Sequence, residues 1–318
     1  MQRDAGFSLV ELMVAMAVML VIAGAATTAL LKMGTTQATI WNRTQMHSGI
    51  RGATEVLQQE VGQAGRVALP AVVTVGAGGS TGGGLTDTLP VSATTGMFVG
   101  EKLTVGGQVP PAVPTRETVV ITAINSSTSL SIASYSGLPL NTHITGEPVA
   151  AYGGFSAGIV PPGTLNGSTS SILKLFGDIN ADGNMVYIEY TCDTAGGNLY
   201  RNSMAWNAAT KLRATASQIL LSNITANPNG TACFTYQTQT VFIAGANTDF
   251  VTDVAITLTV QTQNVDRVTK SYQTETKALL NVSPRNVFNS FGLAGLGYAD
   301  RIQSTPQEVT TLLAGTGS

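Results

Sequence analysis

The sequence is poor in charge. Asp, Glu, Lys and Arg make up 11% of the 318 residues and leave a formal net charge of −2, whereas soluble proteins carry roughly 25% charged residues. No run of Lys or Arg occurs, and binding to a phosphate backbone needs such clusters. Nucleic acid is therefore not expected as a partner. The polar surface must come from Ser, Thr, Asn, Gln and Gly, a mixture typical of β-rich extracellular proteins.

Cysteine and histidine are equally scarce. The chain has two cysteines, Cys192 and Cys233, and two histidines, His47 and His143. It has no CxxC pair, no HExxH motif and no nucleophile elbow, which argues against a zinc site and against the familiar hydrolases. The sequence therefore predicts that the chain is not an enzyme and requires no cofactor, and that His143 is a turn residue.

One long apolar run is present, near the N-terminus. Between Leu12 and Leu31 the only polar residues are Thr27 and Thr28, and at about 1.5 Å per residue such a helix crosses the hydrocarbon core of roughly 30 Å. A secretory signal peptide is cleaved after its apolar core. Here the candidate cleavage site, Gly6-Phe7, comes before the core. Cleavage there would remove a short leader and leave the apolar helix on the mature protein.

Glu11 does not suit a simple anchor. A carboxylate at the edge of an apolar segment is costly in a bilayer, and intramembrane acids usually have a partner and a function. The available partner is the new α-amino group that cleavage would create at Phe7. The alternative is a signal anchor in which Glu11 has no role.

The segment GFSLVELMVA, which starts at Gly6, resembles the cleavage and methylation motif of type IV prepilins. The resemblance implies cleavage after Gly6 by a prepilin peptidase, N-methylation of Phe7, and pairing of Glu11 with the N-terminus of a neighbouring subunit. It also implies a single pass through the inner membrane with a periplasmic head, an inner-membrane assembly platform, other major and minor pilins as partners, and a final place in a pilus at the cell surface. The leader departs from the family pattern because Asp4 follows Arg3 and weakens its positive charge.

The rest of the chain predicts an α+β fold, in which a long N-terminal transmembrane and stalk α-helix packs on an antiparallel β-sheet pilin head with an inserted small β module. The predicted segments are a leader at 1–6, the transmembrane and stalk helix at 7–66, a Gly-rich linker at 67–87, the inserted β module at 88–152, the head at 153–290 and a C-terminal tail at 291–318. Apolar residues recur at spacings of three and four from Ile50 to Ala64, so the outer half of the helix is expected to pack on the head. Gly65 is the expected stop signal.

The head is expected to hold six strands rich in β-branched and aromatic residues. The candidates are Ile172–Phe176, Met185–Thr191, Leu199–Arg201, Ala232–Tyr236, Val254–Gln261 and Ser271–Asn281. Cys192 lies next to one candidate and Cys233 within another. In a periplasmic head these two cysteines are expected to form a disulfide; the alternative is two buried free thiols.

The segment from Asp178 to Glu189 fits the calcium-loop pattern D-x-[DN]-x-[DN]-G-x5-E in full. Asp178, Asn180, Asp182 and Glu189 are therefore candidate calcium ligands, and Ca²⁺ is a possible cofactor. Both flanks read as strands, unlike an EF-hand, so Glu189 is the doubtful ligand. The alternative is a polar hairpin turn in which Asp and Asn side chains bond their own backbone.

Two further segments, from Arg51 to Arg66 and from Tyr272 to Asn286, resemble PilW-like minor pilins. The length of the chain and its inserted module suit a low-copy subunit of an initiation or tip complex, with roles in pilus assembly, motility and cell adhesion. Two other functions share the same N-terminal features. One is a pseudopilin of a type II secretion system, and the other is a tip adhesin whose Ser/Thr-rich module binds a surface or a glycan.

Overall fold

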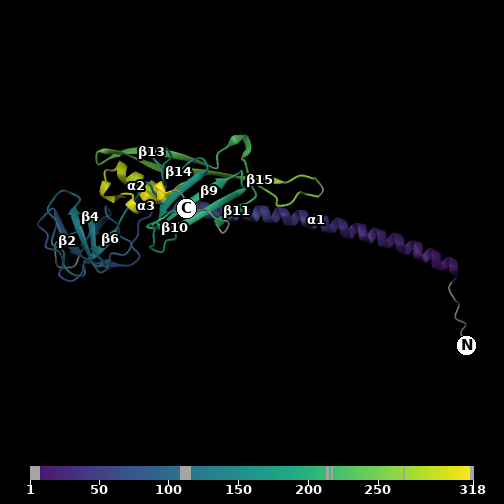
Figure 1. The fold of residues 1–318 in the computed structure, drawn as a ribbon, viewed down its shortest axis with the longest axis horizontal. Helices are drawn as coiled ribbons and strands as arrows, with labels where there is room; N and C mark the ends of the chain where they lie inside the picture. Colours follow the sequence, from purple (N-terminus) through teal and green to yellow (C-terminus); the bar gives the residue numbers. More distant parts are fainter. Residues whose placement is uncertain (1–7, 108–115, 213–214, 216–217, 268, 316–318) are drawn as a thin grey trace, which may run out of the picture.

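One long helix runs into a β-rich head in this computed structural model of the chain (Figure 1). The structure describes residues 8–107, 116–212, 215, 218–267 and 269–315. The predicted α+β class, with an N-terminal helix followed by antiparallel sheets, is confirmed.

Helix α1 (Leu9–Gln63) has two halves in different environments. Its apolar N-terminal part has a mean hydropathy of 2.4 over 18 residues, none of them buried. Its outer half is buried along one stripe that includes Ile50, Leu57 and Val61, as the spacing predicts, and each such side chain contributes roughly 1.5–3 kcal/mol by leaving water. The helix ends where expected, because Gly65 takes a left-handed φ of 79° that favours glycine.

The head consists of two four-stranded antiparallel sheets that share a core with the outer half of α1. The first, in the order β11-β10-β9-β8, comprises β8 (Ile172–Gly177), β9 (Val186–Asp193), β10 (Asn198–Ala205) and β11 (Ile219–Ser222). The second comprises β12 (Ile224–Thr225), β13 (Phe234–Ile243), β14 (Ala246–Gln261) and β15 (Thr274–Val282), with the 3-10 turn η2 (Pro228–Gly230) between β12 and β13. All six strand candidates fall on observed strands. However, β13 and β14 form a much longer hairpin than the sequence predicts.

A buried carboxylate fixes α1 on the first sheet. Glu60 lies on the buried stripe, and Arg201 of β10 donates to it from Nη2 at 2.5 Å and from Nε at 3.0 Å. Tyr190 of β9 donates its hydroxyl to the same carboxylate. Burial lowers the pKa of Arg201, but the hydrogen bonds and charge of Glu60 outweigh that effect and raise it overall. The two strands are thereby tied to one turn of the helix.

The inserted module is a six-stranded antiparallel sheet in the order β1-β6-β3-β4-β5-β2. Its strands are β1 (Val73–Thr74), β2 (Thr86–Pro90), β3 (Lys102–Val105), β4 (Glu117–Ser126), β5 (Ser129–Ser134) and β6 (Pro148–Ala151). The sheet begins at Val73, so the boundary expected at residue 88 is wrong. The module lies at the opposite end of the molecule from the N-terminus (Figure 1).

The Gly-rich segment is part of this module and not a linker. Gly79 and Gly82 have φ values of 63° and 64°, and a Cβ on either would collide with the backbone of residues 141–143. Ser80 also forms a backbone bridge with His143. Glycine is needed here because the chain turns tightly against another segment, which composition alone does not distinguish from flexibility.

His143 is buried, contrary to its expected place at a turn. Its Nε2 lies 2.7 Å from Glu117 Oε1 and its Nδ1 lies 2.7 Å from Glu147 Oε2. Asn141 donates its backbone N–H to the same Glu117 oxygen at 2.9 Å. The imidazole therefore joins β4 to the loop before β6 and has a structural role in the module.

The expected C-terminal tail is folded and connects the module to the head. The helix α2 (Arg285–Gly295) begins in the predicted head and runs into this tail, which also holds the 3-10 turn η3 (Ala299–Arg301), β16 (Ile302–Gln303) and α3 (Gln307–Ala314). Strand β16 pairs in parallel with β7 (Gly154–Phe155). Phe98 of the module, Phe155 and Trp206 of the head, and Val309 of α3 belong to one buried cluster.

Glu101 lies beside this cluster and is fully buried. Its Oε2 accepts the backbone N–H of Phe98 at 3.2 Å, while Oε1 has no hydrogen-bond partner in the described structure. Burial raises the pKa of the Glu101 carboxyl to about 8, and the Phe98 hydrogen bond opposes this only in part. The neutral acid is the form that fits the site.

We expect Arg201→Ala to lower the free energy of unfolding by about 3 kcal/mol, because it leaves the Glu60 carboxylate buried without its cation. Urea unfolding of the full chain in detergent measures the change. Arg51→Ala, at an exposed position of α1, is the matched control and should change stability by less than about 0.5 kcal/mol. Equal effects of the two variants would mean that the buried pair does not hold α1 in place.

We expect the free energy of unfolding to fall as the pH rises from about 4.5 to about 8, by up to about 1.4 kcal/mol per pH unit. In this range the native Glu101 keeps a proton that the unfolded chain has released, because its native pKa is about 8 against an ordinary 4.5. Glu101→Gln should remove this slope and stabilise the chain at pH 8. Urea unfolding at each pH, with exposed Glu55→Gln as the control, tests this, and a slope retained in Glu101→Gln would contradict it.

Candidate functional site

The N-terminal turn of α1 carries the predicted processing and assembly residues. Gly6 and Phe7 lie outside the described residues, so cleavage between them stays a prediction. Glu11 lies in the first helical turn, and its Oε2 accepts the backbone N–H of Ser8 at 3.0 Å. This bond satisfies one of the donors that a helix start leaves without a partner. Glu11 is exposed in the single chain, so its carboxylate can meet an amino group from outside it.

The surface of this helical segment is apolar on every side. Met19 and Leu20 are 73% and 72% exposed, and the large apolar residues from Leu9 to Leu31 are all exposed. A helix that is hydrophobic all round is stable in lipid or among other apolar helices, and not in water. The chain alone buries none of this surface, so the segment requires a membrane or neighbouring subunits.

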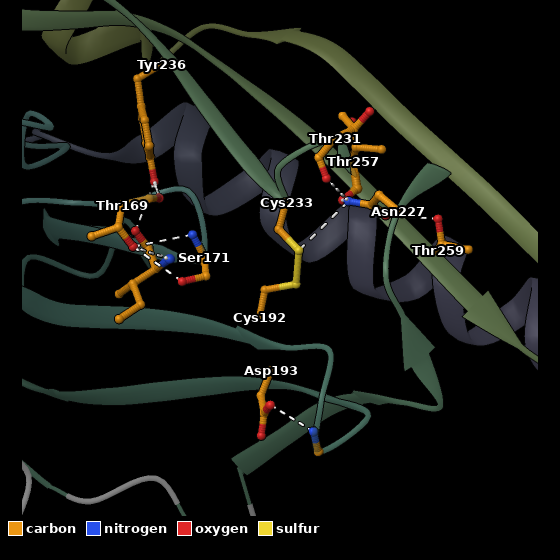
Figure 2. The surroundings of a disulfide bond; sticks show 12 residues. Thr169, Ser171, Cys192, Asp193, Asn227, Thr231, Cys233, Tyr236, Thr257 and Thr259 are labelled. Atoms are coloured by element: carbon orange, nitrogen blue, oxygen red, sulfur yellow. Dashed lines mark hydrogen bonds between the residues drawn. A yellow bond between two sulfur atoms is a disulfide. The ribbon is translucent and has the colours of Figure 1, made fainter. Parts of the chain in front are cut away.

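The expected disulfide is present. The Cys192 and Cys233 sulfur atoms are 2.03 Å apart and their Cα atoms 6.5 Å apart. Cys192 lies on β9 of the first sheet and Cys233 immediately precedes β13 of the second, so the bond joins the two sheets of the head. Figure 2 shows Asn227 beside the bond, with its Nδ2 3.9 Å from Cys233 Sγ. In the chain-entropy model, closing this 41-residue separation stabilises the head by roughly 4 kcal/mol.

The candidate calcium loop connects β8 to β9 as a turn held by its own side chains. Asp178 is buried, and its Oδ1 accepts the backbone N–H groups of Asp182 at 3.0 Å and Gly183 at 3.2 Å. Its Oδ2 lies 3.3 Å from Nε of Arg66, just after α1. Asp182 in turn accepts the N–H of Asn184 at 2.8 Å. These bonds are those of the Asx turn that the sequence offers as the alternative.

Glu189 does not join this loop. It lies three residues into β9 from Val186, about 10 Å along the strand, in register with Lys174 of β8. Its Oε2 is 2.6 Å from Lys211 Nζ and accepts the hydroxyl of Tyr187 at 2.8 Å. The prediction that Glu189 completes a ligand set is therefore wrong, because the β register fixes its side chain elsewhere. Asp178, Asn180 and Asp182 stay candidate ligands, and among the described residues no group of three or more His, Cys, Asp or Glu side chains converges on a metal position.

Glu60 and Arg201 are important residues that the sequence analysis misses. A detectable signal was present, because Glu60 lies three residues after Leu57 and next to Val61, both on the apolar stripe. A charge on the buried face of a helix needs a partner. Arg201 is separated from it by 141 residues, so the sequence alone does not identify that partner.

A protein-family model described as the prokaryotic N-terminal methylation motif matches residues 1–27. The match confirms that this N-terminus resembles those of type IV prepilins. This motif belongs to structural proteins and not to catalysts, and it implies processing by a prepilin peptidase and assembly with other pilins. Comparison with curated proteins and with solved structures finds no match to the chain.

We expect the melting curves of the full chain in detergent to superimpose in excess EGTA and in millimolar calcium. The reason is that Asp178 and Asp182 are engaged by backbone N–H groups and Glu189 by Lys211. Asp182→Ala should shift both curves equally, through loss of its turn bond. A calcium-dependent rise in the melting temperature that Asp182→Ala abolishes would instead establish the three loop residues as an ion site.

Proposed function

We propose that the chain is a PilW-like minor pilin of a type IV pilus, located in its initiation or tip complex. The observation that carries the proposal is the prepilin-like N-terminus, which matches the methylation motif and continues into an exposed apolar helix. Such a helix suits membrane anchoring and packing in a filament. In this proposal the helix crosses the inner membrane once, the head faces the periplasm before assembly, and an inner-membrane platform inserts the subunit.

The shape of the molecule supports a low-copy position. The module, defined here as residues 73–151, projects beyond the head on the side away from the N-terminus of α1 (Figure 1). A projection at that end would meet the next subunit at every position of a shaft, whereas at the tip it has free space. The tip or initiation complex is therefore the position that we favour over the shaft.

Two other interpretations share this N-terminal evidence. The N-terminal motif is common to pilins and to pseudopilins of type II secretion systems, so it does not separate them. For an adhesin, we would expect exposed aromatic side chains on the module to stack on sugars. Tyr152, at the end of the module, is 45% exposed, whereas the other large exposed apolar side chains on its described residues are aliphatic: Leu85, Val99, Ile124, Leu138 and Ile144. One exposed tyrosine is not the aromatic cluster that a sugar-binding surface would need.

We expect Glu11→Ala to be processed and inserted but to reach filaments at less than about a tenth of the wild-type level. The carboxylate favours assembly only when it meets an amino terminus, which offsets the cost of a charge in an apolar environment. The measurement is quantitative immunoblotting of membranes and of sheared filaments. Glu55→Ala, an exposed position on the outer half of the same helix, is the control. Normal incorporation of Glu11→Ala would overturn the assembly role.

Immunogold labelling of sheared filaments, with mass spectrometry of the N-terminus, tests the proposed function itself. The expected result is label at filament tips and a methylated Phe7 as the first residue. Label confined to the cell envelope, together with a loss of protein secretion in a deletion strain, would favour the secretion pseudopilin. An unprocessed N-terminus in purified filaments would overturn both the pilin and the pseudopilin interpretations.

A further inference from the structure

The loop between β14 and β15, residues 262–273, is the part of the head that lies nearest the apolar half of α1. Figure 1 shows it, in yellow-green, extending along α1 towards the N-terminus beyond the rest of the head. Asn264 contacts Asn42 through two hydrogen bonds, of 3.4 Å and 3.5 Å. Arg267 lines the same groove as Ala38. The loop therefore follows the helix as far as the level of Ala38.

The length of the apolar run places this level beside the lipid headgroups. The run from Leu12 to Leu31 is as long as a hydrocarbon core of roughly 30 Å, so Lys32 marks the edge of that core. Ala38 comes six residues later, about 9 Å along the helix. The headgroup layer takes up roughly 5–7 Å of this distance. A long cationic side chain on the loop spans the few ångströms that remain.

The charges of the loop are arranged for an anionic partner. Its one acid, Asp266, is 5% exposed, and its oxygens accept the N–H of Thr269 at 3.1 Å and Nε2 of Gln273 at 2.5 Å. Its two cations, Arg267 and Lys270, are exposed. Among the described residues, no acidic side chain forms an ion pair with either cation. The loop thus uses its acid to hold its own shape and leaves both cations on the outside.

This end of the head differs in charge from the chain as a whole. The chain has a net charge of −2. The loop and residues 32–47 of α1 together hold four Lys and Arg and one acid, the buried Asp266. Glu275, just beyond the loop, is paired with His47. The end that faces the apolar half of α1 is therefore positive, and an anionic lipid surface attracts cations placed next to a membrane span.

We propose that Arg267 and Lys270, together with Lys32, bind the phosphate groups of anionic phospholipids in the leaflet next to the head. This inference rests on the proposed function, because it places α1 across a membrane with the head on one side. The guanidinium and ammonium groups donate charge-assisted hydrogen bonds to phosphate oxygens. The helix attaches the head to the membrane at one point, and the loop adds a second point beside it. Two points of attachment fix the tilt of the head.

A lipid surface is the partner that the geometry favours over a second protein. The distance between the loop and the headgroups is set within one chain, by the length of the apolar run and by the continuity of α1. Every inserted copy therefore meets the headgroups at the same level, before any other subunit binds. Contact with a neighbouring subunit would not depend on the charge of the lipid, and this difference separates the two partners experimentally.

Photo-crosslinking of the full chain in vesicles tests this inference. Benzoyl-phenylalanine replaces Thr269 in the loop or, as the matched control, the exposed Ala278 on β15. The vesicles are phosphatidylcholine alone or phosphatidylcholine with about one-third phosphatidylglycerol, which supplies the negative surface. The expected result is a phospholipid adduct at position 269, about tenfold stronger in the anionic vesicles, and no adduct at position 278. Mass spectrometry of the intact chain measures both.

Charge variants show whether the two loop cations cause the preference. Arg267→Gln combined with Lys270→Gln should reduce the adduct in anionic vesicles to its level in neutral ones. Arg51→Gln combined with Arg285→Gln removes the same charge from exposed positions away from the loop and should leave the adduct unchanged. Raising the salt from about 0.1 M to about 1 M, which shortens the Debye length from about 10 Å to about 3 Å, should also weaken the adduct.

Three outcomes would overturn the inference: equal adducts in the two kinds of vesicle, a crosslink from position 269 to another copy of the chain, or no adduct at that position. All variants should keep the Cys192–Cys233 disulfide and the wild-type melting temperature, so that a misfolded head is not mistaken for lost binding. If filaments contain the chain but position 269 gives no lipid adduct, only this inference fails. If the adduct forms while filaments lack the chain, only the pilus assignment fails.

Discussion

The continuity of α1 is the constraint on which the rest of the structure depends. One uninterrupted helix has an N-terminal half that is stable only in lipid or among other apolar helices, and an outer half that forms one wall of the head's core. The head cannot tilt freely on such a helix, because the buried Glu60 carboxylate is held by Arg201 and Tyr190 from two adjacent strands. A force or displacement applied to the membrane half is therefore transmitted to the first sheet, and through the Cys192–Cys233 bond to the second.

The module is attached to the head through the C-terminal segment as much as through its own two chain connections. Lys102 donates from Nζ to the carbonyl groups of Ala299 and Ile302, and its backbone N–H donates to Gln303 Oε1. Burial lowers the pKa of the Lys102 ammonium, and the negative charge of Asp300 opposes that effect. Because these bonds and the aromatic cluster act together, the module and the head form a continuous packed unit. A module on a flexible linker, which the glycine content suggests, would instead move independently of the head.

Features with a local cause could be predicted from the sequence, and those set by distant contacts could not. The apolar stripe of α1, its end at Gly65 and the positions of six strands follow from periodicity and from single turn residues. The start of the module was missed because Gly79 and Gly82 are read as flexible until their close approach to residues 141–143 is known. Likewise, the calcium-loop pattern is a property of the local sequence alone. The pairing of β8 with β9 places Glu189 opposite Lys174, and its carboxylate forms an ion pair with Lys211. The disulfide was predictable because the chain offers only one pair of cysteines.

The positions of the ion pairs offer a physical reason for the low charge content. Many of the charged groups join separate elements: Glu60 with Arg201, Asp178 with Arg66, and Glu189 with Lys211 are each half-buried or buried. The same groups on the surface would have to lose hydration whenever a neighbouring subunit packed against them, a cost that the attraction of a new partner does not reliably offset. Thr, Gln and Asn surfaces cost less to bury, since their hydrogen bonds with water are replaced by hydrogen bonds with the neighbour. In the proposed pilin role, a subunit that passes from a membrane into a packed assembly would therefore benefit from few charges, and several of those present hold its own elements together.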